Sequence, residues 1–372
     1  MSGVILNRKA VKKNRELKNT WKASKKAYGK LKGKYLKKKI GKVVRLTDEE
    51  LLLEEQTRIT TFCNENNLPK IQELIDKIRN INLEGMSGNG FPVAEKLESF
   101  ASRSHPYSIL LVNAVECEPG ILHDEWLVNH RLQEILTGCN YLQQIFSIDR
   151  VILASKQVVE TGDDIHCEQV PNCFPMGEEY FLIDQVLGKH LNRNELPIEQ
   201  GVLVMNAQTV YQIVKIINHC YDGGRFVTLA NLYSGAARIA YVEDSTKIQK
   251  VLEQCFGKVN LGETEYFAGG GILNAHKVAE DEAFSTKICF AAIGMKSNIT
   301  NDNKCRKCGA CTRNCPMGID VRKIVKALEE NPNADITMYH PENCIQCGSC
   351  TWFCRVSKDV TSYCEPYAGK RI

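Results

Sequence analysis

The sequence predicts an α/β protein of two or three domains that ends in a cysteine-rich domain. Two observations predict this class. Between residues 85 and 217, apolar strands alternate with loops and helices, a pattern typical of a parallel sheet covered by helices. Between residues 305 and 354, one four-cysteine pattern occurs twice. A chain of 372 residues is long enough to form two or three buried cores.

The charges are unevenly distributed along the chain. Residues 1–45 contain 17 Lys and Arg and one acidic residue, Glu16, so this arm carries +16. The whole chain carries +4, which leaves −12 for the other 327 residues. A basic segment interleaved with Trp21, Tyr28 and Tyr35 can bind nucleic acid, anionic lipid or an acidic protein, or remain solvated. We favour disorder or docking onto a redox partner protein over nucleic acid, because nothing else in the chain indicates nucleic acid.

Local signals predict the elements that follow the arm. Thr47-Asp-Glu-Glu50 has the form of a capping box, which predicts a helix from there to about Cys63. A helical pattern restarts over residues 71–78. Next comes the glycine-rich loop Gly85-Met-Ser-Gly88-Asn-Gly90-Phe-Pro92, with Lys96 close behind it. Glycines let backbone N–H groups approach a phosphate and a lysine adds charge, although glycine-rich turns without a ligand are at least as common.

Polar residues follow each predicted strand of this region. The strands are expected at 109–112, 150–154 and 201–205, and helices at 124–138, from 177 to 187, and through 217. The polar and glycine positions beyond the strands are Asn113, Glu116, Glu118, Gly177, Glu178, Glu179, Asn206 and Thr209. Open α/β sheets bind ligands outside the carboxyl ends of their strands. About a dozen residues separate Ala154 from Cys167, which is the lower limit for a helical crossover.

The two cysteine motifs share the spacing C-x2-C-x2-C-x3-C, with a helix expected between them at 321–330. This is the spacing of bacterial two-cluster ferredoxins, in which the fourth cysteine of each motif ligates the other cluster. We therefore predict one [4Fe–4S] cluster on Cys305, Cys308, Cys311 and Cys354. A second is predicted on Cys344, Cys347, Cys350 and Cys315. Zinc and disulfides fit less well, since zinc knuckles pair two C-x2-C units and disulfide frameworks belong to small secreted domains.

The loops taken together resemble a known family. The glycine-rich loop, Asn113-x-x-Glu116-x-Glu118-Pro119, Gly177-Glu178-Glu179 and Asn206-x-x-Thr209 occur in the order and spacing of the flavin-binding subunit of respiratory complex I. The C subunit of the Rnf electron-transport complex is more similar still, and the cobalamin reductase of propanediol utilisation and the electron-transfer proteins beside proline reductase are also similar. The resemblance covers about residues 80–360.

The resemblance implies a domain plan and a set of cofactor contacts. After the arm at 1–45, it implies a Rossmann-like FMN domain at 46–222, a small β-grasp (SLBB-like) domain at 223–300 and a ferredoxin domain at 301–372. The implied FMN contacts are Gly88, Gly90, Lys96, Asn113, Glu116, Gly177 and Asn206. Glu178 and Glu179 lie where the complex I subunit receives NADH. This chain departs from that subunit at Met86, Ser87 and Val115.

Two functions remain open on the sequence alone. In the first, an iron–sulfur flavoprotein passes single electrons between FMN, or an NADH-linked donor, and a partner redox protein. In the second, a degenerate flavin domain binds neither FMN nor NADH, and the protein is a two-cluster carrier or adaptor. No hydrolase motif occurs. Seventeen cysteines lead us to expect a reducing cytoplasm, and the lack of an apolar run of about 18 residues leads us to expect a soluble or peripheral protein. The resemblance implies that the protein is part of a multi-subunit electron-transfer complex and peripheral to a membrane complex.

Overall fold

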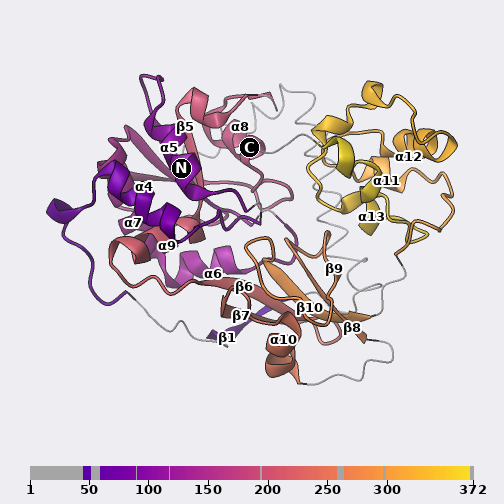
Figure 1. Ribbon diagram of the computed structural model, residues 1–372, viewed down its shortest axis with the longest axis horizontal. Helices are drawn as coiled ribbons and strands as arrows, with labels where there is room; N and C mark the ends of the chain where they lie inside the picture. The colour runs from indigo at the N-terminus through magenta and orange to yellow at the C-terminus, as the bar shows by residue number, and fades with distance from the viewer. Residues whose placement is uncertain are drawn as a thin grey trace.

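The computed structural model describes residues 45–51, 59–88, 90–116, 118–192, 195–257, 264–295 and 299–368. The predicted basic arm lies outside these ranges up to residue 44. Figure 1 shows a parallel sheet with helices (indigo through magenta to pink), a mixed sheet (mostly red to orange, with one indigo strand) and a helical domain that contains the cysteine motifs (orange to yellow). No helix in the described residues is both long enough and apolar enough to cross a membrane.

The first sheet has four parallel strands in the order β4-β3-β2-β5. They are β2 (Ile109–Ala114), β3 (Arg150–Ser155), β4 (Ile165–Gln169) and β5 (Val202–Asn206). Every residue of β2 and β5 is buried, as expected for parallel strands that are covered on both faces. The parallel sheet predicted from the strand–loop–helix repeats is confirmed.

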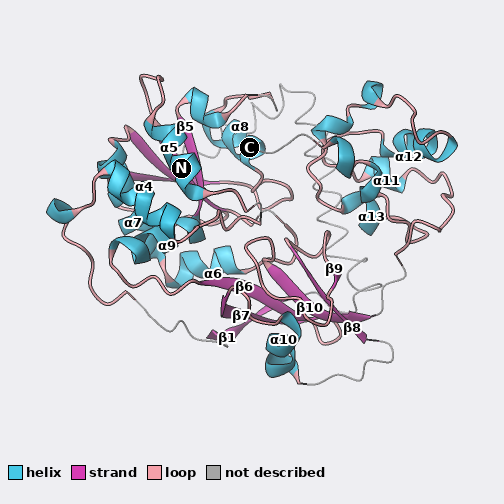
Figure 2. Cartoon of the chain, in the orientation of Figure 1, coloured by secondary structure: helices cyan, strands magenta, loops and turns pink. Residues whose placement is uncertain are grey.

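Helices cover both faces of this sheet unequally (Figure 2). One face packs against α4 (Ile71–Asn80), α5 (Val93–Ala101), α6 (His123–His130), α7 (Leu132–Phe146) and α9 (Ala207–Ile217). The other face packs against α8 (Glu179–Leu187) and residues 170–176. Short 3-10 turns lie at Glu65–Asn67 and Pro197–Gln200.

Two connections differ from their expected form. The helix predicted over 124–138 is divided into α6 and α7 at Arg131, whose φ of −135° is not helical. The Arg131 guanidinium lies 5.0 Å from the centre of the Trp126 ring, so a tertiary contact accompanies the break. Residues 156–164, between β3 and β4, form no helix. The short crossover foreseen from the sequence is therefore a loop joining two adjacent parallel strands.

The helix predicted to begin at Thr47 is wrong. Arg45–Leu51 is strand β1, which runs parallel to β7 (Ala236–Glu243) and places Arg45 opposite Ala236. A capping box is a local signal, whereas the free edge of β7 offers backbone partners that only the tertiary fold brings into reach. Backbone pairing with that edge overrides the local preference.

The second sheet is mixed and has the order β1-β7-β6-β10-β8-β9. Its other strands are β6 (Gly224–Asn231), β8 (Thr264–Gly269), β9 (His276–Lys277) and β10 (Phe290–Met295). β6 and β7 form an antiparallel pair, and β10 runs parallel to β6. Helix α10 (Ile248–Phe256) packs its apolar residues on this sheet. A mixed sheet with one packed helix fits the predicted β-grasp domain.

The third unit holds both cysteine motifs among short helices. These are α11 (Ala310–Arg313), α12 (Val321–Glu330) and α13 (Ser349–Trp352), with 3-10 turns at Thr337–Tyr339, Pro341–Asn343, Thr361–Tyr363 and Glu365–Tyr367. The helix predicted at 321–330 is confirmed with the same bounds. Its Val321, Ile324 and Val325 are buried in a core that also contains cysteines of both motifs.

The third unit packs directly against the other two. Ile345, Cys347 and Phe353 share an apolar core with Phe174 of the first unit. Ile272, Leu273 and Phe290 of the second unit join the same core. The cysteine motifs are therefore fixed in place beside both sheets.

Candidate functional site

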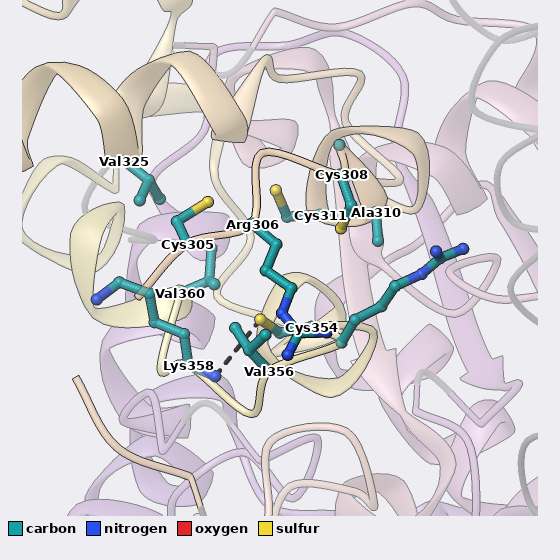
Figure 3. A pocket seen from close by; sticks show the side chains of 12 residues that line it. Cys305, Arg306, Cys308, Ala310, Cys311, Val325, Cys354, Val356, Lys358 and Val360 are labelled. Carbon is teal, nitrogen blue, oxygen red and sulfur yellow. Dashed lines mark hydrogen bonds between the residues drawn. The ribbon is translucent and has the colours of Figure 1, made fainter. Parts of the chain in front are cut away.

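Four cysteines from the two motifs line one pocket (Figure 3). Cys305, Cys308 and Cys311 come from the first motif, and Cys354 comes from the second. We call these four residues the outer set. The structure thus brings together the cysteines that the spacing assigns to one cluster, although Cys354 is more than forty positions away in the sequence.

The remaining four cysteines, Cys315, Cys344, Cys347 and Cys350, form the inner set. Burial, together with the charges of Cys315 and Cys344, raises the pKa of Cys350 to about 12. Burial likewise raises the pKa of Cys315 to about 11, with a contribution from Cys344. These mutual effects show that the thiols are near one another. Such thiols lose their protons when they ligate a metal centre.

Corresponding backbone groups in the two motifs have the same geometry. Lys307 and Gln346 both adopt positive φ, at 55° and 52°. Their N–H groups donate to Cys305 Sγ at 3.3 Å and to Cys344 Sγ at 3.4 Å. Donors aimed at sulfur stabilise the thiolate, which is the form that binds iron. Both loops therefore fit cysteines that ligate clusters.

The edge of the four-stranded sheet gathers the residues predicted to contact FMN. Asn113 in β2 lies directly beside Asn206 at the end of β5 and beside Ala154 in β3. Glu116 follows β2, and Gly177 precedes α8. Residues from four separate segments therefore meet at the carboxyl ends of the strands, as expected for an open α/β sheet.

Two ion pairs join side chains at this edge. Lys96 Nζ lies 3.2 Å from Glu179 Oε1. Glu116 pairs with Lys156, and it also accepts a hydrogen bond from the N–H of Glu125 at 3.0 Å. Lys156 was not among the predicted residues, although it directly follows strand β3 and the same strand-end rule applies to it.

Hydrogen bonds hold the other predicted side chains. Asn113 Nδ2 donates to Gly177 O at 2.8 Å, and Asn206 Nδ2 donates to Asp124 Oδ1 at 3.2 Å. Glu178 caps α8 by accepting from the N–H of Phe181 at 3.4 Å. The predicted polar side chains therefore lie together at the strand ends, and each of these three is already engaged in a hydrogen bond within the protein. A flavin phosphate that binds Lys96 competes with Glu179 for it.

The glycine-rich loop is a tight turn packed on the second unit. Gly88 and Gly90 have φ of 84° and 63°, which is the glycine-specific geometry that the sequence predicts. The N–H of Met86 donates to Thr209 Oγ1 at 3.0 Å. A Cβ on Gly88 would lie 3.6 Å from Cys289 Sγ, and Glu84 bonds Thr286, so the loop is held against residues 286–289.

Two ionisable side chains are buried below the edge. Burial, together with the charge of Arg225, lowers the pKa of His123 to about 3. Burial raises the pKa of Asp124 to about 7, against the opposing effect of its hydrogen bond from Asn206. At neutral pH the His123 imidazole below this edge is therefore uncharged, and the Asp124 carboxyl group is close to its titration midpoint.

Two protein-family models match the chain. A model described as the Nuo51 FMN-binding domain matches residues 78–215, and a 4Fe–4S dicluster domain matches residues 297–355. This chain is similar to the C subunit of the ion-translocating oxidoreductase complex from two organisms. The identity is 27% over 281 residues for Buchnera aphidicola and 27% over 264 residues for Vibrio cholerae.

This chain matches only part of the length of these relatives. The alignments cover 70% and 67% of the chain but 54% and 34% of the relatives. Among solved structures, an NAD+-reducing [NiFe]-hydrogenase in its H2-reduced state is similar with a TM-score of 0.55 and 12% identity, over 83% of this chain and 64% of that one. The predicted fold class and the resemblance to the Rnf protein are confirmed.

We predict that the stability of Asp124→Asn depends less on pH than that of the wild type. The wild-type carboxyl titrates near pH 7 when folded and near 3.8 when unfolded, so the folded state holds the extra proton between these values. Stability then falls as the pH rises through this window, by on the order of 4 kcal/mol in total, and stays level above it.

Thermal melting from pH 5.5 to 8 measures this difference. The free energy of unfolding of Asp124→Asn should rise relative to that of the wild type as the pH increases, because the amide does not ionise in this range. The amide oxygen also still accepts the hydrogen bond from Asn206. Asp76→Asn, at an exposed site on α4, serves as the control and follows the wild type. A variant at position 124 that loses stability with rising pH as steeply as the wild type would contradict the assignment.

A second prediction concerns Thr361, whose Oγ1 lies 3.4 Å from Cys350 Sγ. Thr361→Val is expected to lower the reduction potential of the inner cluster by about 20–60 mV. One hydrogen bond contributes about 0.5–1.5 kcal/mol, and about 1.4 kcal/mol corresponds to 59 mV for one electron. A redox titration followed by EPR measures the shift. Ser362→Ala, whose hydroxyl bonds Asp359 O at 3.0 Å, is the control; equal shifts in both variants would refute the role of Thr361.

Proposed function

We propose that this protein transfers electrons one at a time, through two [4Fe–4S] clusters, between a donor site at the edge of the four-stranded sheet and a partner redox protein. One observation carries the proposal: the inner-set loop at Cys347 and Gly348 packs against loops of both sheets. The matches to an FMN-binding domain and to a dicluster domain support it.

The packing orders the two clusters. Burial raises the pKa of Cys347 and the charge of Glu118 raises it further, so the inner set lies near the loop that leaves β2. That loop also bonds the second unit, where the N–H of Ile272 donates to Pro119 O at 3.1 Å. The outer set opens instead into the pocket lined by Arg306 and Arg355. Electrons therefore pass between the donor site and the inner cluster, and between the outer cluster and the partner protein.

FMN is the cofactor that suits the donor site in this proposal. Bound FMN accepts electrons in pairs and releases them singly. Lys96 and the backbone N–H groups of the glycine-rich loop would hold its phosphate. Asn113, Glu116, Gly177 and Asn206 would orient the remainder at the strand ends, while Glu178 and Glu179 would face NADH. The assignment to a larger multi-protein assembly follows the names of the relatives and belongs to the same proposal.

The two ion pairs favour a second function. Lys96–Glu179 and Glu116–Lys156 neutralise the charges that a flavin would use, and the glycine-rich loop is packed against residues 286–289. In this alternative, the protein carries electrons through its clusters alone and receives them from another protein. Flavin binding distinguishes the two functions.

The crossed pairing of the cysteines predicts which cluster each variant loses. Cys354→Ala is expected to damage the outer cluster and Cys315→Ala the inner one, so that iron falls from about eight toward about four per chain in each. In Cys354→Ala, the potential of the remaining cluster still responds to Thr361→Val. Cys289→Ala, at a buried thiol outside the motifs, keeps all the iron. If the reduction potential of the surviving cluster in Cys354→Ala does not change when Thr361→Val is added, the proposed pairing is wrong.

An anaerobic absorbance titration with NADH, after incubation with FMN, tests the flavin site. About one FMN per chain is expected, with bleaching of both flavin and clusters on addition of NADH. Lys96→Ala should weaken FMN binding about 10- to 100-fold, because a hydrogen bond to a charged group contributes about 1.5–3 kcal/mol. Lys70→Ala is the exposed control. Two intact clusters with no FMN uptake and no response to NADH would establish the carrier function instead.

A further inference from the structure

Five exposed basic side chains surround the outer set. Lys304, Arg306 and Lys307 flank Cys305, Arg313 ends α11, and Arg355 follows Cys354. We call these five residues the basic rim. Arg306 and Arg355 line the same pocket as the four cysteines. Figure 3 shows Arg306 beside Cys354. The other three flank that pocket through the cysteine loop, where Arg313 Nη1 donates to Cys308 O at 2.8 Å.

The five side chains of the basic rim are exposed, and among the described residues none has a carboxylate as an ion-pair partner. Lys358, which lines the same pocket, shows the contrast. Its side chain is 3% exposed and it pairs with Glu329 at 3.0 Å. Lys358 therefore stabilises the domain, whereas the rim presents its charge to whatever approaches the outer set.

The basic rim is a local feature of an acidic protein. Beyond the arm at residues 1–45, the chain carries −12, so most of its surface repels an acidic protein and the rim attracts one. Complementary charge accelerates encounter and selects the orientation in which two proteins meet. The attractive patch also surrounds the cysteine set that opens to the surface, so the favoured orientation brings a partner next to the outer cluster.

We propose that an acidic one-electron carrier protein docks on the basic rim and exchanges an electron with the outer cluster. This inference rests on the proposed function for the cluster itself and adds the chemistry of the partner. In the step, one electron leaves the reduced outer cluster and enters the oxidised carrier, or the reverse, and no bond or proton changes. The carrier's carboxylates pair with Arg306 and Arg355 across the pocket.

Stopped-flow mixing of the reduced full-length protein with an oxidised acidic ferredoxin tests the docking. Arg306→Glu with Arg355→Glu should lower the second-order rate at least tenfold at low ionic strength, in the range by which steering alters encounter rates. The difference should vanish at 1 M salt, where the Debye length is about 3 Å. Arg306→Lys with Arg355→Lys should retain the rate, because the charge is kept.

A matched control separates the rim from the basic arm, which is present in every variant. Lys70→Glu with Lys250→Glu changes the net charge equally at exposed sites on the first and second units. Equal slowing by both double variants would overturn the proposal, because the rate would then depend on the net charge of the protein or on the basic arm and not on the basic rim. A basic cytochrome as acceptor should react no more slowly with the Arg306→Glu, Arg355→Glu protein than with the wild type.

Calorimetric binding of the same ferredoxin separates this inference from the function on which it rests. Weaker binding in the Arg306→Glu, Arg355→Glu protein alone, with no electron transfer in any sample, would support the docking surface and contradict the proposed function. Normal cluster reduction with equal binding and equal rates in all proteins would overturn the docking surface and leave the proposed function intact.

Discussion

The close approach of Gly348 to the second unit is the constraint on which the arrangement of the clusters depends. Gly348 has a φ of 73°, and a Cβ at that position would come within 2.2 Å of Leu273 O. Only glycine combines that backbone geometry with that contact. The neighbouring Cys347 is thereby buried in the core shared by all three units. A cluster bound there is held by the fold as a whole rather than by the motif alone.

The parts of the site that could be predicted from the sequence are those fixed by local spacing or by a general rule of sheet topology. The spacing of Cys305, Cys308 and Cys311 is a property of one loop, and the strand-end rule locates Asn113 and Asn206. The rule applies equally to Lys156, which directly follows β3 and was not among the predicted residues. What no local pattern contains is the pairing between loops: Lys96 meets Glu179 only because α5 and α8 approach the same edge.

The errors in the fold have the same origin. Thr47-Asp-Glu-Glu50 satisfies a helix signal, but the segment pairs with β7, a strand nearly two hundred residues away. The helix predicted over 124–138 contains no proline before its break, and a long side-chain contact between Arg131 and Trp126 accompanies the break. Propensity is a weak guide wherever long-range backbone pairing or side-chain packing offers a competing partner.

The electrostatics of the two cysteine sets differ in a way that orders their potentials. Net local charge, hydrogen bonds to sulfur and solvent exposure set the potential of a cluster. Glu118 lies beside the inner set, and a nearby negative charge disfavours the reduced, more negative cluster. The basic rim has the opposite effect on the outer set. By charge alone, an electron is therefore held more strongly at the outer set than at the inner one. Hydrogen bonds to the inner set, such as that from Thr361, oppose this gradient, so the two potentials report which effect dominates.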